Sequence, residues 1–267
     1  ILIRGGGDLA SGVAMRLYKA GFRVYITELP EPMVVRRAVS FAEAVFRGEL
    51  TVEGISARLA EDRGEASVLA ERGIIPVLVD PMLDCLEEIN PAVVVDARMM
   101  KRSPQTGLNL APLVIGLGPG FVAGEHCHAV VETNRGHYLG RVYWEGAAEA
   151  DTGIPGRVGT RQAERVLRAP CSGLLETLCE IGDRVKAEDV VADVEGAPVK
   201  AVFDGLVRGL MHAGIHVQDG QKIGDIDPRM EREYCFTISE KALAIGGAVL
   251  EAVLSRMDLK SAELLTE

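Results

Sequence analysis

The first ten residues restrict the fold of this chain more than any other stretch. An apolar run at 1–3 leads into Gly5-Gly6-Gly7-Asp8-Leu9-Ala10, and the apolar spacing of a helix follows and ends near Gly21. The pattern is G-x-G-x-x-[GA] between a strand and a helix, which is the context that dinucleotide-binding folds require. The first glycine permits the tight turn, the second lets the backbone approach a pyrophosphate, and the helix N-terminus attracts its charge. The sequence therefore predicts that a phosphate-bearing ligand is bound by Gly5, Gly6, Gly7, Asp8, Leu9 and Ala10.

A carboxylate follows the glycine loop at the place where such folds hold a ribose. Glu28 ends the next predicted strand, 22–27, and an acid at a strand end can accept a hydrogen bond from a ribose hydroxyl. We therefore predict that Glu28 takes part in cofactor binding. The alternative is a domain of the same shape that binds no dinucleotide.

The remainder of the first half alternates between predicted strands and helices. Short continuous apolar runs at 74–79, 92–95 and 111–115 are typical of parallel strands that are buried on both faces. A further strand is predicted at 50–59 and a helix at 65–72. This alternation predicts an α/β protein with a Rossmann-like, mostly parallel sheet.

Polar residues and glycines follow two of these strands, where open α/β sheets bind their ligands. Asp96 and Lys101 come after the strand at 92–95, and Gly118 and Gly120 come after the next one. We predict Asp96 and Lys101 as catalytic candidates, with the amides of Gly118 and Gly120 presented to an anion. In the alternative interpretation Asp96 caps a helix and Lys101 is a solvated surface charge.

The densest cluster of metal-type ligands is Glu125-His126-Cys127-His128. Two imidazoles and a carboxylate would suit zinc or iron, but neither H-E-x-x-H nor paired cysteine spacing is present. We therefore predict no metal site and expect these histidines to bond to the backbone. The five cysteines are scattered, without C-x-x-C, which favours a reducing compartment over a disulfide framework.

Composition excludes several classes of partner. The net charge of −10 disfavours nucleic acid or an anionic membrane as the main partner. No apolar run approaches the roughly 20 residues of a membrane span, and no targeting signal is recognisable, so we expect a cytoplasmic protein. A Walker loop, G-x-S-x-G and Tyr-x-x-x-Lys are all missing from the sequence. Arg36 and Arg37 favour either a 2′-phosphate or, more commonly on a helix, solvated surface charges.

An internal repeat marks the second half of the chain. Two strands with a hairpin turn at 134–136 and a breaker-rich loop at 151–156 precede it. The pattern of Gly173, Gly182, Val185, Val191, Asp193 and Val194 recurs 32 residues later as Gly205, Gly214, Val217, Ile223, Asp225 and Ile226. A two-fold repeat of short β units is similar to lipoyl- or biotinyl-type barrels. The hairpin tip at 196–198 carries no lysine and Lys200 lies past it, so we expect an unmodified barrel.

These boundaries predict three segments. Residues 1–156 form the Rossmann-like cofactor-binding domain, 157–230 the small β-barrel, and 231–267 a C-terminal helical tail. An apolar, alanine-rich helix is predicted at 239–257, packing back on one of the domains. Gly246 and Gly247 would weaken this helix by roughly 1 kcal/mol each in isolation, so they imply close packing.

Several long blocks of the sequence resemble the YqeB family. They are 4–12, 27–29, 36–41, 95–98 with Lys101, 116–121, 131–137, 139–142, 152–156 and 224–229. The family is identified as accessory proteins of selenium-dependent molybdenum hydroxylases, and the resemblance extends over essentially the whole chain. It implies a bacterial cytosolic maturation factor, and it implies no particular catalytic residues.

The resemblance and the glycine loop together predict an accessory protein that matures or inserts the molybdenum cofactor. The loop would hold the cofactor or its dinucleotide form, and the partner would be the selenium-dependent hydroxylase. Cys127 is the best-placed thiol for handling selenium or sulfur, although a buried inert cysteine is the more common case. One alternative is an NAD(P)-dependent oxidoreductase, and another is a non-catalytic scaffold that docks the hydroxylase. Whether the chain is an enzyme, and whether it forms a homo-oligomer, stays open.

Overall fold

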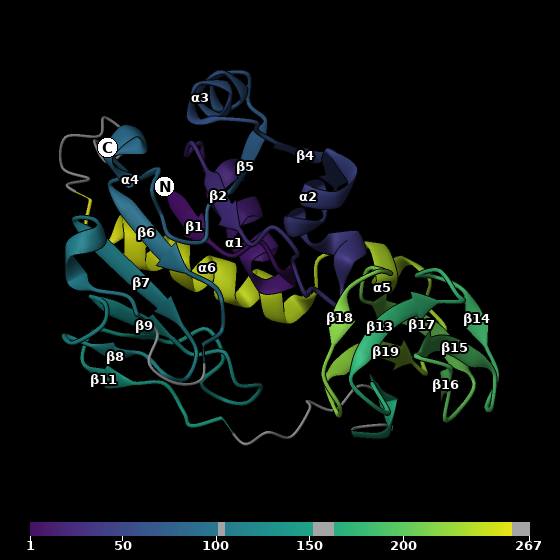
Figure 1. The fold of residues 1–267 in the computed structure, drawn as a ribbon. Coiled ribbons are helices and arrows are strands. Elements are labelled where there is room, and N and C mark those ends of the chain that lie inside the picture. The colour runs from purple at the N-terminus through teal and green to yellow at the C-terminus, as the bar shows by residue number, and fades with distance from the viewer. Residues whose placement is uncertain (101–104, 152–162, 258–267) are drawn as a thin grey trace.

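A computed structural model describes residues 1–100, 105–151 and 163–257. The described residues form a large sheet with helices on both faces and a smaller antiparallel part beside it (Figure 1). The large sheet has nine strands in the order β10-β9-β7-β6-β1-β2-β5-β4-β3. Their bounds are β1 Leu2–Arg4, β2 Tyr25–Glu28, β3 Glu49–Val52, β4 Ile55–Leu59, β5 Ile75–Val79, β6 Val93–Asp96, β7 Leu113–Leu117, β9 Ala129–Val131 and β10 Val142–Tyr143.

The prediction of a mostly parallel sheet is confirmed. Strands β4, β5, β2, β1, β6, β7 and β9 are parallel neighbours in that spatial order, and only the edge pairs β3–β4 and β9–β10 are antiparallel. The chain first adds strands on one side of β1, beginning with β2, and later adds strands on its other side, beginning with β6. The direction in which the sheet grows therefore reverses between β1 and β6. In doubly wound sheets, ligands bind outside the carboxyl ends of the strands at such a reversal. The fold therefore predicts a ligand site at the carboxyl ends of β1 and β6.

The single strand predicted at 50–59 is wrong, because two strands form there. A two-residue turn at Glu53 and Gly54, with φ of 47° and 80°, separates β3 from β4. Positive φ at both central positions is the geometry of a tight hairpin turn. Glutamate rarely adopts a positive φ, so only Gly54 of these two residues indicates a turn in the sequence.

Helices cover the two faces of the sheet. Helices α1 (Asp8–Lys19) and α6 (Glu240–Leu254) pack together on one face, while α3 (Arg63–Glu71) and α4 (Leu86–Ile89) lie on the other. Successive side chains of β1 point to opposite faces of the sheet. Ile3 therefore packs in the core beneath α1 and α6, and Leu2 packs in the core beneath α3 and α4. The predicted return of the C-terminal helix onto a domain is thereby confirmed.

Helix α6 approaches α1 most closely at two glycines. A Cβ on Gly246 would lie 2.5 Å from the carbonyl oxygen of Gly12, and a Cβ on Gly12 would lie 2.5 Å from that of Ala242. Close packing is therefore confirmed for Gly246. A Cβ on Gly247 would meet open space, so the prediction of close packing is wrong at that position.

The antiparallel part consists of two four-stranded sheets, ordered β12-β19-β17-β14 and β16-β15-β13-β18. Its strands are β12 Val166–Arg168, β13 Gly173–Thr177, β14 Arg184–Val185, β15 Val190–Val194, β16 Ala197–Lys200, β17 Gly205–Leu210, β18 His216–Val217 and β19 Lys222–Asp227. The starts of β13, β14 and β15 recur 32 residues later as the starts of β17, β18 and β19. Pairing repeats as well, with Leu175 opposite Val194 and Val207 opposite Ile226. The predicted two-fold repeat is confirmed.

The hairpin between the two halves has a two-residue tip. Glu195 and Gly196, with φ of 50° and 81°, connect β15 to β16. Lys200 lies at the other end of β16, where its Nζ is 3.2 Å from Glu188. The exposed tip thus presents a glutamate and a glycine, and the expectation that this part is unmodified stays a prediction.

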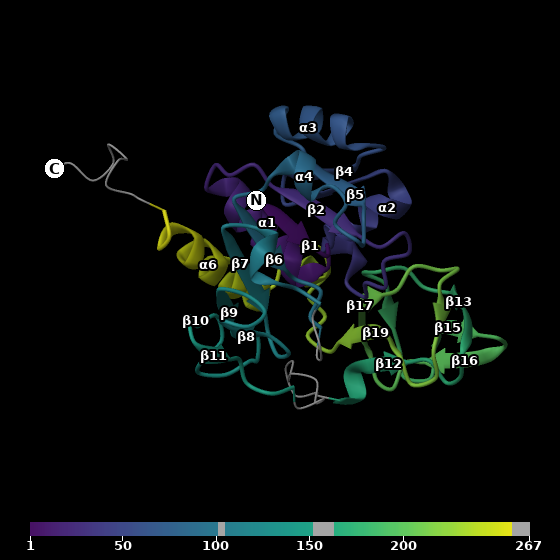
Figure 2. The ribbon, with the colours of Figure 1, turned by 60° about the vertical axis from the view of Figure 1, so that its left-hand side comes forward.

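The segment 33–46 joins the antiparallel part to the large sheet (Figure 2). Gly209 packs so tightly that a Cβ there would lie 2.8 Å from Val35, and the Phe46 and His212 rings stack with 4.1 Å between centroids. Arg37 donates from Nε to the carbonyl of Leu210 at 3.0 Å. The expectation that Arg36 and Arg37 are surface charges is wrong, because both are buried at this junction.

Candidate anion-binding site

Gly5 and Gly6 are fixed by the turn and by the chain that crosses it. Gly5 has a φ of +91°, which favours glycine, and its amide donates to the Thr27 carbonyl at 2.8 Å. A Cβ on Gly6 would lie 2.8 Å from the amide nitrogen of Ala42, which donates to the Gly6 carbonyl at 2.9 Å. The segment after β2 therefore covers this part of the loop.

Gly7 occupies a different environment. Its φ is −64°, and a Cβ there would meet only Val34, at 3.8 Å. Gly7 precedes α1 and provides no side-chain cap, so the amides of the first turn are available to an outside acceptor. Uncapped first-turn amides carry the positive end of the helix dipole. The accessible part of the loop thus consists of Gly7 and the first turn of α1.

Glu28 holds the glycine loop in place. Its Oε2 accepts from the Gly6 amide at 2.6 Å, and its Oε1 accepts from the Leu29 amide at 2.8 Å. Burial raises the pKa of Glu28, while these two backbone hydrogen bonds act in the opposite direction. A ribose contact by Glu28 stays a prediction, since both carboxylate oxygens already serve the protein's own backbone.

Arg36 brings a buried guanidinium to the N-terminus of α1. It is 9% exposed, and its NH1 lies 3.9 Å from Oδ2 of Asp8 in the first turn. Its NH2 donates to the Tyr234 carbonyl at 2.9 Å, which fixes the side chain. The buried Nε has no hydrogen-bond partner among the described residues. Buried polar groups are normally satisfied, so this covered nitrogen is an exception beside the α1 N-terminus.

Two half-buried lysines approach the same helix end from different parts of the fold. Lys222 begins β19 of the antiparallel part, and Lys241 lies in the first turn of α6. Burial lowers the pKa of both, the negative charge of Asp8 opposes this, and Lys241 also feels the charge of Lys222. Within the described ranges neither ammonium group has an ion-pair partner. These are two desolvated positive charges on which carboxylates act without forming an ion pair: Asp225 and Asp8 on Lys222, and Asp8 and Glu132 on Lys241.

The neighbouring cations are neutralised. Arg165 forms a buried ion pair with Asp225, and Nε of Arg208 lies 3.6 Å from Asp227. Arg135 lies 2.7 Å from Glu240. Of the described cations that lie around the α1 N-terminus, Lys222 and Lys241 are therefore the ones without an ion pair. We call the group formed by the α1 N-terminus, Arg36, Lys222 and Lys241 the α1 cation cluster.

Asp96 lies at the same sheet edge, but its carboxylate is already saturated. It is fully buried, and Arg98 grips it with Nε at 3.0 Å and NH2 at 2.7 Å, while the Thr106 hydroxyl donates to it as well. Arg4 lies 3.9 Å away. These contacts give Asp96 a structural role, and its catalytic role stays a prediction. Lys101 lies outside the described residues.

The two glycines predicted to present amides after β7 differ in their surroundings. Gly118, with φ of +77°, donates its amide to the Val131 carbonyl at 2.9 Å. A Cβ on it would lie 2.5 Å from the Thr133 hydroxyl, so Gly118 serves the packing of β7 against β9. Gly120 also has a positive φ, of 97°. An anion contact by either stays a prediction.

The Glu125–His128 cluster is used by the backbone, as expected. His126 accepts at Nδ1 from the Val122 amide at 3.1 Å, and His128 accepts from the Val114 amide at 2.9 Å. Cys127 is fully buried, and burial is the main reason that its pKa is raised to about 11. Its thiol is therefore protonated near neutral pH, which argues against its role in handling selenium or sulfur.

A hollow at the carboxyl edge of the sheet has the wrong charge for a phosphate. It measures about 530 Å³ and lies between α3 and α4, at the end of β5. Five carboxylates line it, against one guanidinium from Arg63; they are Glu61, Asp62, Asp80, Asp84 and Glu88. The described residues contain no group of three or more His, Cys, Asp or Glu able to hold a metal ion.

The sequence interpretation missed Lys222 and Lys241. One signal for Lys222 exists within the repeat: the equivalent position in the first half is Val190, an exposed apolar residue. The lysine is thus a departure from the repeat at a position where the first half has an apolar residue. Lys241 carries no such local signal.

Comparison with known proteins gives one close relative. No family model matches the chain. The chain is 51% identical over 257 residues to the uncharacterized protein YqeB of Escherichia coli (strain K12). It is a close homologue of YqeB. The alignment covers 96% of this chain and 48% of YqeB, so the chain spans about half the length of that relative.

Solved structures give only weak similarity. An aspartoacylase family protein from Mesorhizobium loti has a TM-score of 0.28 at 13% identity, with 84% of each chain covered. A succinylglutamate desuccinylase/aspartoacylase from Rhodobacter sphaeroides has a TM-score of 0.22 at 27% identity, covering 31% of this chain and 29% of the other. Similarity at this level carries no inference about this chain. Within the described residues, no helix has the length and apolarity required to cross a membrane.

Proposed function

We propose that the chain binds a phosphate-bearing ligand at the α1 cation cluster. The observation that carries this proposal is the convergence of Lys222 and Lys241, both desolvated and unpaired among the described residues, on an uncapped helix N-terminus. Desolvated positive charge without a partner is costly, and a bound anion would remove that cost. First-turn amides and ammonium groups are the donors that phosphates prefer.

The proposal includes a finer assignment of the two parts of the fold. The large sheet is Rossmann-like, which its strand order supports: its six strands from β5 to β9, numbered along the chain, follow the order 3-2-1-4-5-6, and β4 adds a further parallel strand beside β5. The antiparallel part is a lipoyl- or biotinyl-type barrel, which its 32-residue repeat supports. The barrel carries no tip lysine, and its contribution is Lys222, which it brings to the cluster through its docking on 33–46.

We propose further that the ligand is the molybdenum cofactor or its dinucleotide form. The chain would be a cytoplasmic accessory protein that matures this cofactor or inserts it into a selenium-dependent molybdenum hydroxylase, as the family resemblance implies. The α1 cation cluster suits its phosphate groups, with the Arg36 guanidinium as a further positive charge beside the first turn of α1. The cofactor itself would supply the molybdenum redox chemistry, and this chain's residues would bind and orient its phosphate end.

The structure favours this over an NAD(P)-dependent oxidoreductase. In a conventional dinucleotide site the strand-end acid and the glycine loop enclose a ribose. Here Ala42 packs on Gly6, and Glu28 uses both oxygens to bind amides of the chain itself. The space for an adenosine ribose is therefore restricted by the protein's own segment, whereas the phosphate position at Gly7 stays open.

A pair of variants at Gly7 tests the proposal. Gly7→Asp adds a carboxylate at the N-cap, where aspartate favours the helix, so the fold is retained while a phosphate is repelled. Gly7→Ala is the matched control, because its Cβ meets only Val34 at 3.8 Å. The measurement is mass spectrometry of small molecules that co-purify with each protein from cells making the hydroxylase. We expect a pterin phosphate with the wild type and Gly7→Ala, and none with Gly7→Asp.

Two outcomes would overturn the proposal. The first is the absence of any pterin phosphate from all three proteins, together with normal hydroxylase activity in a strain that lacks the chain. The second is undiminished hydroxylase maturation by Gly7→Asp while the protein still co-purifies with the hydroxylase. That second result would instead support a non-catalytic scaffold.

A further inference from the structure

An exposed aromatic group lies on the loop that follows β9. Tyr138 is 45% exposed, and its hydroxyl has no hydrogen-bond partner within the described ranges. His137 meets its ring edge-on with 5.1 Å between centroids, and the Arg141 guanidinium lies 5.2 Å from the ring centroid. Aromatics make up only 4% of this chain, so an exposed tyrosine flanked by an imidazole and a guanidinium is unusual in it. Such a group presents a π face to solvent.

The protein holds this loop firmly. Buried Glu132 accepts from the amides of Asn134 and Glu149, each at 2.7 Å, and its carbonyl accepts from the Gly140 amide at 3.0 Å. These bonds fix both ends of the turn that carries Tyr138. A stacking group that is preorganised in this way costs little conformational entropy when a ring binds.

The same loop runs along the first turns of α6, beside the α1 cation cluster. A Cβ on Gly140 would lie 3.2 Å from the Ala244 carbonyl, and Arg135 lies 2.7 Å from Glu240. Arg135 also acts electrostatically on Lys241. The loop therefore connects the exposed ring to the cluster through a few residues at the start of α6.

We propose that the ligand is a phosphate ester of a planar heterocycle, whose ring stacks on Tyr138 while its phosphate occupies the α1 cation cluster. This inference rests on the proposed phosphate site and adds the residue against which the ring of the ligand stacks. Ring stacking on tyrosine tolerates different heterocycles, because each presents a π face. Arg141 strengthens the stack through its position over the same ring system.

The other candidate for such a role is Tyr234, on the short helix Glu233–Phe236. It is 41% exposed, and Arg229 lies 4.4 Å from its ring centroid. Asp227 holds that arginine through two hydrogen bonds, at 2.9 Å to Oδ1 and 2.6 Å to Oδ2, so this ring is covered by a fixed guanidinium. Tyr234 is therefore the comparison residue for Tyr138.

Calorimetric titration separates the two parts of the ligand. The probes are inorganic pyrophosphate, ribose 5-phosphate and guanosine 5′-monophosphate, added to the full chain as wild type, Tyr138→Leu, Tyr138→Phe and Tyr234→Leu. We expect the wild type to bind the guanosine ester at least about fivefold more tightly than ribose 5-phosphate. Tyr138→Leu should lose this preference while keeping its affinity for pyrophosphate, and Tyr138→Phe and Tyr234→Leu should keep both.

The inference about the ring is overturned if Tyr138→Leu retains the preference for the guanosine ester, or if Tyr234→Leu loses it instead. Absence of pyrophosphate binding by the wild type would overturn the proposed phosphate site itself, and the ring inference with it. Tyr138 is exposed and its hydroxyl is unpartnered, so the leucine variant should fold normally, which its unfolding temperature checks.

Discussion

Two polar clusters lie near the carboxyl edge of the same sheet, and they differ in how their charges are compensated. Around Asp96 the carboxylate is matched by Arg98, Thr106 and Arg4. At the α1 cation cluster, two lysines are half-buried and have no ion-pair partner among the described residues. A saturated cluster holds the fold together, whereas an unsaturated one has binding capacity left for a ligand. The burial of the residues and the sign of their charges would not by themselves distinguish a structural cluster from a binding site.

The largest expected effect is on the stability provided by the saturated cluster. Asp96→Asn leaves the Arg98 and Arg4 guanidinium groups without their buried carboxylate, which should cost about 3–5 kcal/mol in the free energy of unfolding. Urea denaturation followed by circular dichroism measures this. The control is Asp219→Asn, on an exposed turn of the barrel. A loss below about 1 kcal/mol for Asp96→Asn would contradict the structural role assigned to it.

The next expected effect concerns pH. Burial lowers the pKa of Lys222 and Lys241 below the ordinary value of 10.5, so each loses its proton at a lower pH than a surface lysine does. Pyrophosphate binds the charged form, so its affinity should fall as the pH rises through these lowered pKa values, before 10.5 is reached. Titrations at a series of pH values and constant ionic strength check this. Affinity that stays constant until ordinary lysines titrate would argue against these two groups.

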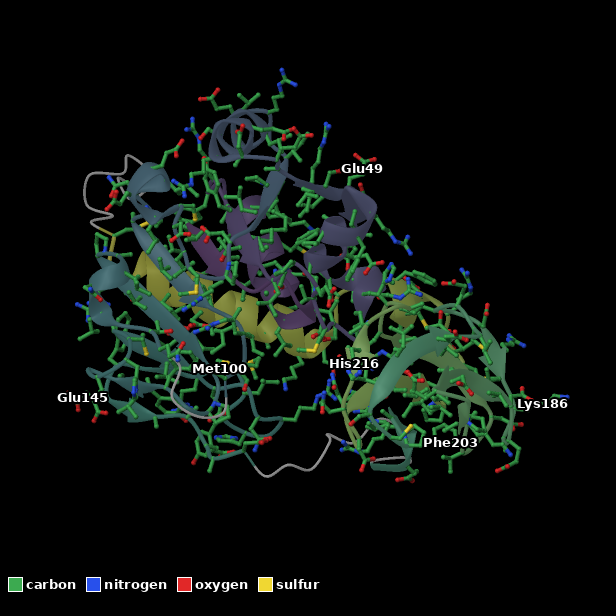
Figure 3. The ribbon with its side chains drawn as sticks, in the orientation of Figure 1. Glu49, Met100, Glu145, Lys186, Phe203 and His216 are labelled. Atoms are coloured by element: carbon green, nitrogen blue, oxygen red, sulfur yellow. The ribbon has the colours of Figure 1, made fainter. Side chains whose placement is uncertain are left out.

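The smallest expected effect is on the stability provided by the unsaturated cluster. Lys222→Gln and Lys241→Gln each remove a desolvated charge that has no partner, so the free energy of unfolding should change by less than about 1 kcal/mol or increase. Lys186→Gln is the matched control, since Lys186 is exposed on the far side of the barrel (Figure 3). Destabilisation by several kcal/mol would show that the lysines are structural after all.

Much of the fold could be predicted because its signals are local or periodic. The glycine loop, the buried strands and the repeat each depend on spacing within one stretch of sequence, which the structure reproduces. The hairpin at 49–59 was missed because Glu53 takes a positive φ that glutamate rarely adopts. Arg36 and Arg37 were misjudged because their burial results from packing of the antiparallel part against segment 33–46, which no local sequence pattern indicates.

The candidate site was only partly predictable for the same reason. Gly7 and the start of α1 follow from the motif, but Lys222 and Lys241 come from β19 and α6, more than 200 residues further along the chain. Their convergence depends on how the barrel and α6 pack against α1. Figure 3 shows His216 of the barrel on the side that faces the sheet and Met100 on the sheet side. Such a juxtaposition is tertiary, and a single sequence contains no spacing rule for it.

The most direct test of the central claim is calorimetric titration of pyrophosphate into the wild type and the double variant Lys222→Gln, Lys241→Gln. Loss of two charge-assisted contacts should weaken binding at least about 100-fold, on the order of 3 kcal/mol, while the unfolding temperature stays unchanged. The result that would contradict the claim is equal pyrophosphate affinity in the two proteins.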